Sequence, residues 1–141
     1  MSDRVFVDTN ILIYAHDADA GLKHTIAAER VRELWMSRDG VISLQVLQEL
    51  YVNVTRKIPK PLSRKVAREL VGSYAAWTVQ RVDAADVVRA SEIEERHKLS
   101  FWDALIVVAA HKATAATLLS EDLNHGQRIE GVRVENPFRG K

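Results

Sequence analysis

The sequence predicts an α/β fold, a three-layer α/β/α sandwich with a mainly parallel five-stranded sheet. The first observation behind this prediction is that short β-rich runs alternate with longer helical stretches along the 141 residues. The second is that several of these runs are rich in valine and leucine without polar alternation, as strands buried on both faces tend to be. Strands separated by helices imply right-handed crossovers, so we expect helices on both faces of the sheet.

Five short runs are expected to form the strands. The first, Arg4-Val5-Phe6-Val7-Asp8, is apolar until it reaches a carboxylate, and the fourth, Ala116-Thr117-Leu118-Leu119-Ser120, is followed closely by two more acids. In chain order, the predicted strands are 4–8, 40–43, 77–82, 116–120 and 132–135.

Five helices are expected between these strands, over residues 24–37, 43–57, 62–75, 84–98 and 101–113. Pro59 and Pro61 mark the break before the third helix. The segment 104–110 is almost wholly apolar, so the last helix should be buried on all sides. The clearest amphipathic spacing, i, i+3, i+4 and i+7, is that of Leu47, Leu50, Tyr51 and Val54.

Length and composition indicate one globular domain over residues 1–141. Hydrophobic residues make up 47% and charged residues 28% of the chain, which suits a soluble protein with its own core. The absence of cysteine excludes disulfides and cysteine-ligated zinc. No apolar run has the length of a membrane span and the N-terminus lacks a signal-peptide layout, so we expect a cytoplasmic protein. Because the net charge is only +1, any attraction to nucleic acid must come from local patches of positive charge.

Two acids directly follow strands of the predicted sheet. Asp8 ends the first strand, and Asp122 lies in the loop after the fourth. In open α/β sheets, ligands bind at the carboxyl ends of the strands, at the point where the strand order reverses. If the first and fourth strands are neighbours across that point, the two carboxylates face each other across one cleft.

Two further acids lie on helices at the same end of the sheet. Glu49 is in the helix that begins after the second strand, beside its apolar face. Asp103 comes three residues after Ser100, a spacing close to that of a capping box, at the start of the buried helix. The four acids are therefore expected to share one end of the sheet.

Each of these acids has an ordinary structural explanation when it is taken alone. Asp8 and Asp122 could be turn residues, Glu49 could lie on a solvated face, and Asp103 could cap its helix. Their joint placement favours a site, because at about 5 Å and an effective dielectric of about 20 each ionised pair costs roughly 3 kcal/mol. Such a cluster takes up protons or binds a cation, and oxygen ligands without cysteine suit Mg²⁺, with Mn²⁺ as the alternative.

These motifs resemble those of the PIN-domain nucleases, and in particular of the VapC-type toxins of toxin–antitoxin pairs. The matching pieces are Val7-Asp8-Thr9-Asn10, Glu49, Phe101-Trp102-Asp103-Ala104-Leu105-Ile106, Leu119-Ser120-Glu121-Asp122-Leu123-Asn124, and the tail from Asn124 to Phe138. The resemblance implies a metal-dependent endoribonuclease acting on single-stranded or loop RNA, with the strand order 3-2-1-4-5. It also implies a homodimer and a cognate antitoxin as partner.

The following roles are a hypothesis for that activity. Asp8 and Asp103 are the principal ligands of the Mg²⁺, Asp122 completes the site and could help hold a second metal, and Glu49 orients or deprotonates the attacking water. In-line attack on the phosphodiester would leave a 5′-phosphate and a 3′-hydroxyl. Polar neighbours either hold the carboxylates in place or make turn and cap hydrogen bonds; these are Thr9, Asn10, Ser120 and Asn124.

A basic stretch is the candidate surface for the RNA backbone. Six positive charges occur within thirteen residues that contain no acid, and they could hold RNA phosphates. A solvated basic face, or a surface for the acidic parts of an antitoxin, is the alternative interpretation. The residues are Arg56, Lys57, Lys60, Arg64, Lys65 and Arg68.

The tryptophans and histidines are expected to have structural roles. The three tryptophans, Trp35, Trp77 and Trp102, are expected in the core or in an interface rather than as base-stacking platforms, although Trp102 is next to Asp103. The five histidines have no zinc-ligand spacing.

The sequence leaves two other classes of function open, a phosphatase or phospho-acceptor domain and a binding module. An Mg²⁺-dependent phosphatase could use a similar sheet, but the haloacid type has a second acid two residues after its nucleophile, where Asn10 stands here. A phospho-acceptor domain would need paired acids near the first strand and a lysine after the last, and neither arrangement is convincing. A catalytically weak RNA- or antitoxin-binding module could use the acids only to receive an antitoxin arginine, although the intact set of acids argues against it.

Overall fold

The apolar runs form one sheet of six strands within residues 3–139, the part of the chain that the computed structural model describes. The order is β3-β2-β1-β4-β6-β5, and every neighbouring pair is parallel except β5 and β6. The predicted fold class is confirmed, and the five predicted strands follow the order 3-2-1-4-5. The strands are β1 (Val5–Val7), β2 (Gly40–Ser43), β3 (Thr78–Gln80), β4 (Thr117–Leu119), β5 (Arg128–Ile129) and β6 (Val132–Glu135).

The short strand β5 is the one that the sequence did not predict. It pairs with β6 as a hairpin whose two turn residues, Glu130 and Gly131, have φ angles of 51° and 83°. Positive φ at both central positions is the requirement of a type I′ turn, which Asn-Gly or Asp-Gly normally signals. Here a glutamate occupies the first position, and a two-residue strand is too short to show alternation.

Side chains cap the starts of the α-helices between residues 3 and 139, except the one that begins after Gly21, which has no side-chain cap. Ser43 caps the helix after β2, Ser63 the one after the proline break, and Asp83 forms a full capping box with Asp86. The predicted helices are present with boundaries shifted by up to two residues. They are α2 (Leu22–Ser37), α3 (Leu44–Arg56), α4 (Arg64–Tyr74), α5 (Ala84–His97) and α6 (Phe101–Lys112).

One α-helix, α1 (Thr9–His16), was not predicted, and neither was the 3-10 turn η1 (Ala18–Ala20) that follows it. The centre of α1, from Ile11 to Tyr14, is apolar at every position, so it has no 3.6-residue alternation to reveal it. Its N-cap is Asp8, the residue that the sequence predicts as the end of the first strand.

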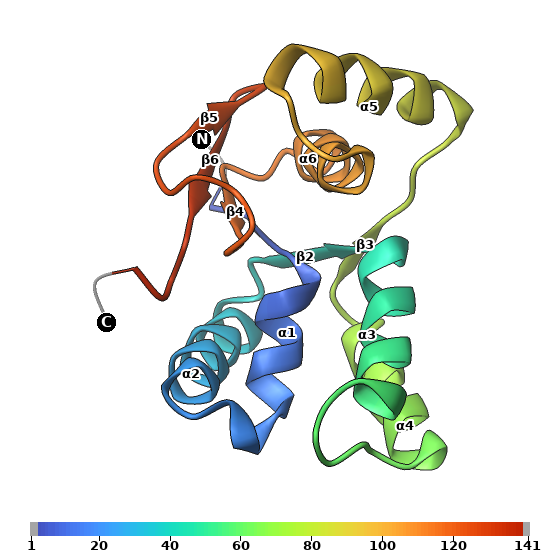
Figure 1. The fold of residues 1–141 in the computed structure, drawn as a ribbon, viewed down its shortest axis with the longest axis vertical. Helices are drawn as coiled ribbons and strands as arrows, with labels where there is room; N and C mark the ends of the chain where they lie inside the picture. The colour runs from blue at the N-terminus through green and yellow to red at the C-terminus, as the bar shows by residue number, and fades with distance from the viewer. Residues whose placement is uncertain (1–2, 140–141) are drawn as a thin grey trace.

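The elements make three layers, as predicted. Helices α5 and α6 lie on one side of the sheet, and α1 to α4 lie on the other (Figure 1). Helix α6 is central on its side, because every residue from Ala104 to Ala110 is buried. The wholly apolar segment from 104 to 110 is explained by this position between the sheet and α5.

The parallel register brings the carboxyl ends of the two central strands together. Val7 at the end of β1 pairs with Leu119 at the end of β4, and the backbone N–H of Asp8 donates to the carbonyl oxygen of Leu119 at 3.0 Å. The next residues along, Asp8 and Ser120, are therefore adjacent at the edge of the core.

No helix within residues 3–139 is both long enough and apolar enough to cross a membrane.

Candidate metal centre

Asp8 is fixed at the junction between β1 and α1. One carboxylate oxygen accepts a hydrogen bond from the backbone N–H of Thr9 at 2.8 Å, and the other accepts from the hydroxyl of Ser120 at 2.8 Å. Only 6% of the Asp8 surface is exposed. A carboxylate this buried needs partners for its charge, and the two hydrogen bonds supply part of that compensation.

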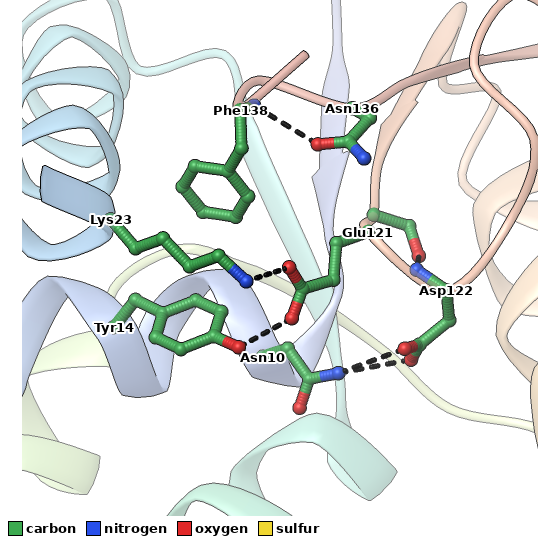
Figure 2. Close-up of polar contacts among 8 residues, drawn as sticks. Asn10, Tyr14, Lys23, Glu121, Asp122, Asn136 and Phe138 are labelled. Atoms are coloured by element: carbon green, nitrogen blue, oxygen red, sulfur yellow. Dashed lines mark hydrogen bonds and ion pairs between the residues drawn. The ribbon is translucent and has the colours of Figure 1, made fainter. Parts of the chain in front are cut away.

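Asp122 is held in the loop after β4 by its neighbours on both sides. Its backbone N–H donates to the hydroxyl of Ser120 at 3.1 Å, and its two carboxylate oxygens accept from the side-chain amide of Asn10 at 3.0 and 3.2 Å (Figure 2). The hydroxyl of Ser120 thus contacts both Asp8 and the backbone of Asp122. Asn10 and Ser120 join α1 to the β4 loop across the central strands.

Asp103 lies in the first turn of α6. Ser100 caps this helix by accepting from the backbone N–H of Asp103 at 3.1 Å, as the spacing predicted. The return bond of a capping box is absent, and the Asp103 carboxylate makes no hydrogen bond within residues 3–139. Capping therefore accounts for Ser100 and leaves the Asp103 carboxylate available to the site.

Carboxylate oxygens of these three aspartates converge. One oxygen from each of Asp8, Asp103 and Asp122 lies within 4.8 Å of the others. This donor set consists of hard oxygen ligands with no thiol or imidazole, which fits a divalent cation of the Mg²⁺ class. The cluster predicted from strand ends and helix starts is thus formed by side chains from three separate parts of the chain.

Glu49 faces the same pocket from α3 but is outside the group of three. One of its carboxylate oxygens accepts from the hydroxyl of Thr9 at 2.6 Å. Its side chain is half-buried, as expected from its position at the edge of the apolar face. Thr9 thereby connects the start of α1 to α3 and fixes the Glu49 carboxylate at the wall of the pocket that the three aspartates also line.

Burial and repulsion together disfavour the ionised form of the aspartates. Burial, helped by the charges of Asp122 and Asp103 and opposed by the hydrogen bonds from Ser120 and Thr9, raises the pKa of Asp8 to about 7. Burial also raises the pKa of Asp122, helped by the charges of Asp103 and Glu121 and opposed by the hydrogen bond from Asn10. A bound cation would offset both causes, since it supplies the missing positive charge.

The acids lie in an open pocket of about 110 Å³, and its other walls include residues that were not among the predicted site residues. Gln45 and Asn53 are each four residues from Glu49, so the helical i±4 rule could have found them once Glu49 was chosen. The lining consists of Asp8, Thr9, Asn10, Gln45, Glu49, Asn53, Trp102, Asp103, Ile106 and Asp122.

A second polar cluster fastens the β4 loop to the first two helices. Glu121 accepts from the hydroxyl of Tyr14 and forms an ion pair with Lys23 at 2.7 Å (Figure 2). The Lys23 ammonium also lies over the rings of Tyr14 and Phe138, at 5.0 and 5.4 Å from their centroids. No local sequence pattern indicates these contacts, because Glu121 is about one hundred residues from both of its partners.

Some predicted site residues lie apart from the pocket. Asn124 is exposed, and its backbone carbonyl accepts from Gln127 in the turn that follows. The six basic residues are all exposed, and none of them lines the acidic pocket. One of them, Arg68, lines a separate apolar groove of about 650 Å³ between α3 and α4, together with Leu44, Leu47, Gln48, Tyr51, Val52, Val71 and Gly72.

Comparison with known proteins gives one family and a set of similar folds. The sequence model of the PIN domain matches residues 5–128. No curated protein matches this chain.

Several solved structures are similar in fold. A toxin–antitoxin complex from Klebsiella pneumoniae contains a chain with 22% identity and a TM-score of 0.68, over 95% of this chain and 98% of that one. A DNA-bound VapBC from Salmonella typhimurium has 19% identity and a TM-score of 0.67, over 97% and 99%. VapC20 of Mycobacterium tuberculosis, described as a toxin that cleaves the sarcin-ricin loop, has 22% identity and a TM-score of 0.61, over 81% and 86%.

Proposed function

Because this chain belongs to the PIN-domain family, we propose that it is an endoribonuclease that depends on a divalent cation and acts as the toxin of a toxin–antitoxin pair. The observation that carries this proposal is the convergence of Asp8, Asp103 and Asp122 within 4.8 Å. Mg²⁺ is the ion we propose, with Mn²⁺ as an alternative of the same ligand preference. Because its substrate would be cellular RNA, we expect the protein to act in the cytoplasm.

The three aspartates would hold the cation, and other residues hold the aspartates. Asp8 and Asp103 are the principal ligands in this proposal, and Asp122 completes the set. Ser120 and Asn10 orient two of the three carboxylates through the hydrogen bonds described above. A divalent cation bound there would neutralise the carboxylates, polarise the scissile phosphate and make water a better nucleophile.

Glu49 is the residue we assign to the attacking water. Its carboxylate faces the pocket beside the aspartates, and one of its oxygens is fixed by Thr9. The other oxygen can orient a water molecule or accept its proton. In-line displacement at phosphorus would then leave a 5′-phosphate and a 3′-hydroxyl.

The basic residues would contact the RNA away from the bond that is cut. Arg56 and Lys57 lie at the C-terminal end of α3, and Arg64, Lys65 and Arg68 lie on α4, all exposed. A single strand of RNA that enters the pocket continues beyond it on both sides, so phosphates several nucleotides away could reach this surface.

The experiment that tests the nuclease proposal compares four proteins on one structured RNA. Wild type should cleave with Mg²⁺ or Mn²⁺ and stop in EDTA, while Asp8→Asn and Asp103→Asn should fall to background, because each loses a charged ligand at nearly constant shape. Glu92→Gln, an exposed acid on α5, is the matched control and should cleave like wild type. Activity that persists in EDTA or in Asp103→Asn would contradict the proposal.

The partner we propose is an antitoxin that covers the acidic pocket with a cationic segment. The similar chain from Klebsiella pneumoniae comes from a toxin–antitoxin complex, which supports a partner of this kind. Expression of this chain alone should arrest growth, and the product of a small neighbouring gene should co-purify with it and suppress cleavage. Normal growth with abundant soluble protein would count against the toxin role.

The oligomer we propose is a homodimer, as the resemblance implies. The apolar groove between α3 and α4 leaves Leu44 42% exposed, and such surface is available for a protein partner. Sedimentation velocity of the purified chain tests this, and a monomer across the accessible concentration range would contradict it.

A further inference from the structure

Trp102 differs from the other two tryptophans of the chain in its surroundings. Trp35 and Trp77 pack with Tyr74 in one cluster, with ring centroids 5.1 to 5.3 Å apart. Trp77 is buried in that cluster, whereas Trp102 is 63% exposed. Of the two positions expected for Trp102, in the core or in an interface, the core position is therefore wrong, and its large apolar face is open to solvent.

The indole of Trp102 is placed at the edge of the acidic pocket. It lines that pocket together with Asp103, the next residue along the chain, and with Gln45 and Asn53 on α3. It lies in the first turn of α6, whose start is fixed by the Ser100 cap. The half-buried ring of Phe101 meets the indole edge to face, with centroids 5.3 Å apart and an interplanar angle of 78°. The indole is thus supported before any ligand arrives, which lowers the entropy cost of a contact.

The surroundings of Trp102 favour a nucleotide over a second protein chain as its ligand. The other walls of the pocket are mostly polar amides, a hydroxyl and carboxylates. The apolar surface that a protein partner would cover is the separate groove between α3 and α4, which Trp102 does not line. A flat aromatic ring beside a phosphate-processing site suits the face of a nucleobase, and such stacking is worth about 1–3 kcal/mol per base.

We propose that Trp102 is a stacking platform for the base of a nucleotide next to the scissile phosphate, and that it selects unpaired RNA. A base in a duplex already stacks on both of its neighbours, so only an unpaired base can offer a free face to the indole. The proposal rests on the proposed nuclease function, since it needs RNA in the acidic pocket. It assigns to Trp102 a role in substrate binding and no role in the chemical step.

Binding can be measured without cleavage, in EDTA, by fluorescence anisotropy of a labelled single-stranded oligoribonucleotide of mixed sequence. Trp102→Leu keeps an apolar side chain without a π face, and it should raise the Kd roughly 5- to 100-fold. Trp102→Phe should restore most of the affinity. Val88→Ala, which changes a residue 64% exposed on α5, is the control and should bind like wild type.

Two further measurements separate stacking from other roles. In a Trp35→Phe background, unlabelled single-stranded RNA should quench the tryptophan fluorescence, and Trp102→Leu should abolish that quenching. The same oligonucleotide annealed to its complement should bind wild type and Trp102→Leu equally. With Mg²⁺ present, Trp102→Leu should raise KM for single-stranded RNA more than it lowers kcat.

The outcomes that overturn the proposal are distinct from failure of the nuclease function. Equal single-strand affinity in Trp102→Leu and wild type, with cleavage intact, removes the stacking role and leaves the nuclease. Loss of a dimer in Trp102→Leu at unchanged RNA affinity per protomer assigns the indole to a protein interface instead. A wild-type protein that binds RNA but does not cleave it with Mg²⁺ or Mn²⁺ removes the nuclease function. A wild-type protein that neither binds nor cleaves RNA removes both proposals.

Discussion

The Asp8 carboxylate is subject to two opposing effects. Burial and the nearby carboxylates raise its pKa to about 7, while the hydrogen bonds from Ser120 and Thr9 favour the charged form. A fold that keeps an acid in this position without compensation loses stability as the acid ionises. A bound cation would compensate the charge of the ionised carboxylate, so that the buried acid becomes part of a cation-binding site.

We predict that the stability of the metal-free protein falls as the pH rises from 4 to 7. The folded pKa of Asp8 lies above its ordinary value of 3.8, so its contribution is fully present below that value and is lost as the pH passes through about 7. The full difference corresponds to about 4 kcal/mol. Thermal melts in EDTA should show this loss, and Mg²⁺ or Mn²⁺ should raise Tm more at pH 8 than at pH 5.

Asp8→Asn is the control for this pH dependence. The variant has no charge to gain at this position, so its metal-free stability should change less over the same range, and added metal should have little effect. Equal pH slopes in wild type and Asp8→Asn would show that another group is responsible.

A second prediction at the scale of one residue concerns the hydrogen bond from the Thr9 hydroxyl to Glu49 and its effect on kcat. Thr9→Val keeps the shape of the side chain and removes the donor to Glu49. A hydrogen bond to a charged group is worth about 1.5–3 kcal/mol, so kcat for RNA cleavage should fall roughly 10- to 100-fold while KM stays close to the wild-type value. Thr9→Ser should retain most of the activity. A parallel loss in Thr9→Ser would mean that the methyl group and its packing matter, and not the hydroxyl.

At the scale of elements, the carboxyl ends of β1 and β4 and the starts of α1, α3 and α6 form the site. Each of these three helix starts carries a capping side chain, and the acids of the candidate site lie at that cap or within two turns of it. The aromatic cluster at the opposite end of the strands fixes the amino end of β2. There Gly40 is in direct contact with the ring of Trp77.

Two glycine substitutions should change stability in opposite directions. A Cβ on Gly40 would lie 2.5 Å from the ring of Trp77, so Gly40→Ala should destabilise the protein by about 1–3 kcal/mol. Gly72 is in α4 with nothing within 4 Å of an added Cβ, so Gly72→Ala should stabilise it by about 0.5–1 kcal/mol. Urea unfolding measures both, and the prediction for β2 fails if Gly40→Ala is as stable as wild type.

Elements with a clear local pattern could be predicted, and those without one could not. The parallel strands and the helices from α2 to α6 show runs, breaks and caps that are visible in the sequence. Helix α1 is apolar at its centre, and β5 depends on a turn at Glu130 and Gly131 that lacks the usual residues. Helix α1 and strand β5 were therefore not predicted, because neither has a periodic pattern in the sequence.

At the scale of the whole molecule, the convergence of the acids could be predicted from the sequence. The side-chain contacts that hold the loop around them could be predicted only in part. Strand ends and helix starts converge in any parallel α/β sheet, which located Asp8, Asp103 and Asp122. The contacts of Glu121 with Tyr14 and Lys23 join segments about one hundred residues apart, and only tertiary packing brings them together. The exposure of Trp102 likewise depends on packing, because its sequence neighbours resemble those of a core residue.

The basic surface should act on RNA affinity through its charge. Arg64→Ala combined with Arg68→Ala should weaken binding and reduce the slope of log K against log salt by roughly 1.4, since each phosphate contact on a single strand contributes about 0.7. Arg32→Ala combined with Arg128→Ala removes two other exposed charges and is the control. A slope that is the same in both double variants would exclude a specific role for α4.

The most direct test of the central claim is Mn²⁺ binding measured by electron paramagnetic resonance on wild type and on Asp8→Asn, Asp103→Asn and Asp122→Asn. We predict saturable binding to wild type and to the Glu92→Gln control, weakened at least roughly tenfold by each aspartate substitution, because each removes one charged ligand. Unchanged Mn²⁺ binding in Asp103→Asn would contradict the claim that the three carboxylates form a metal centre.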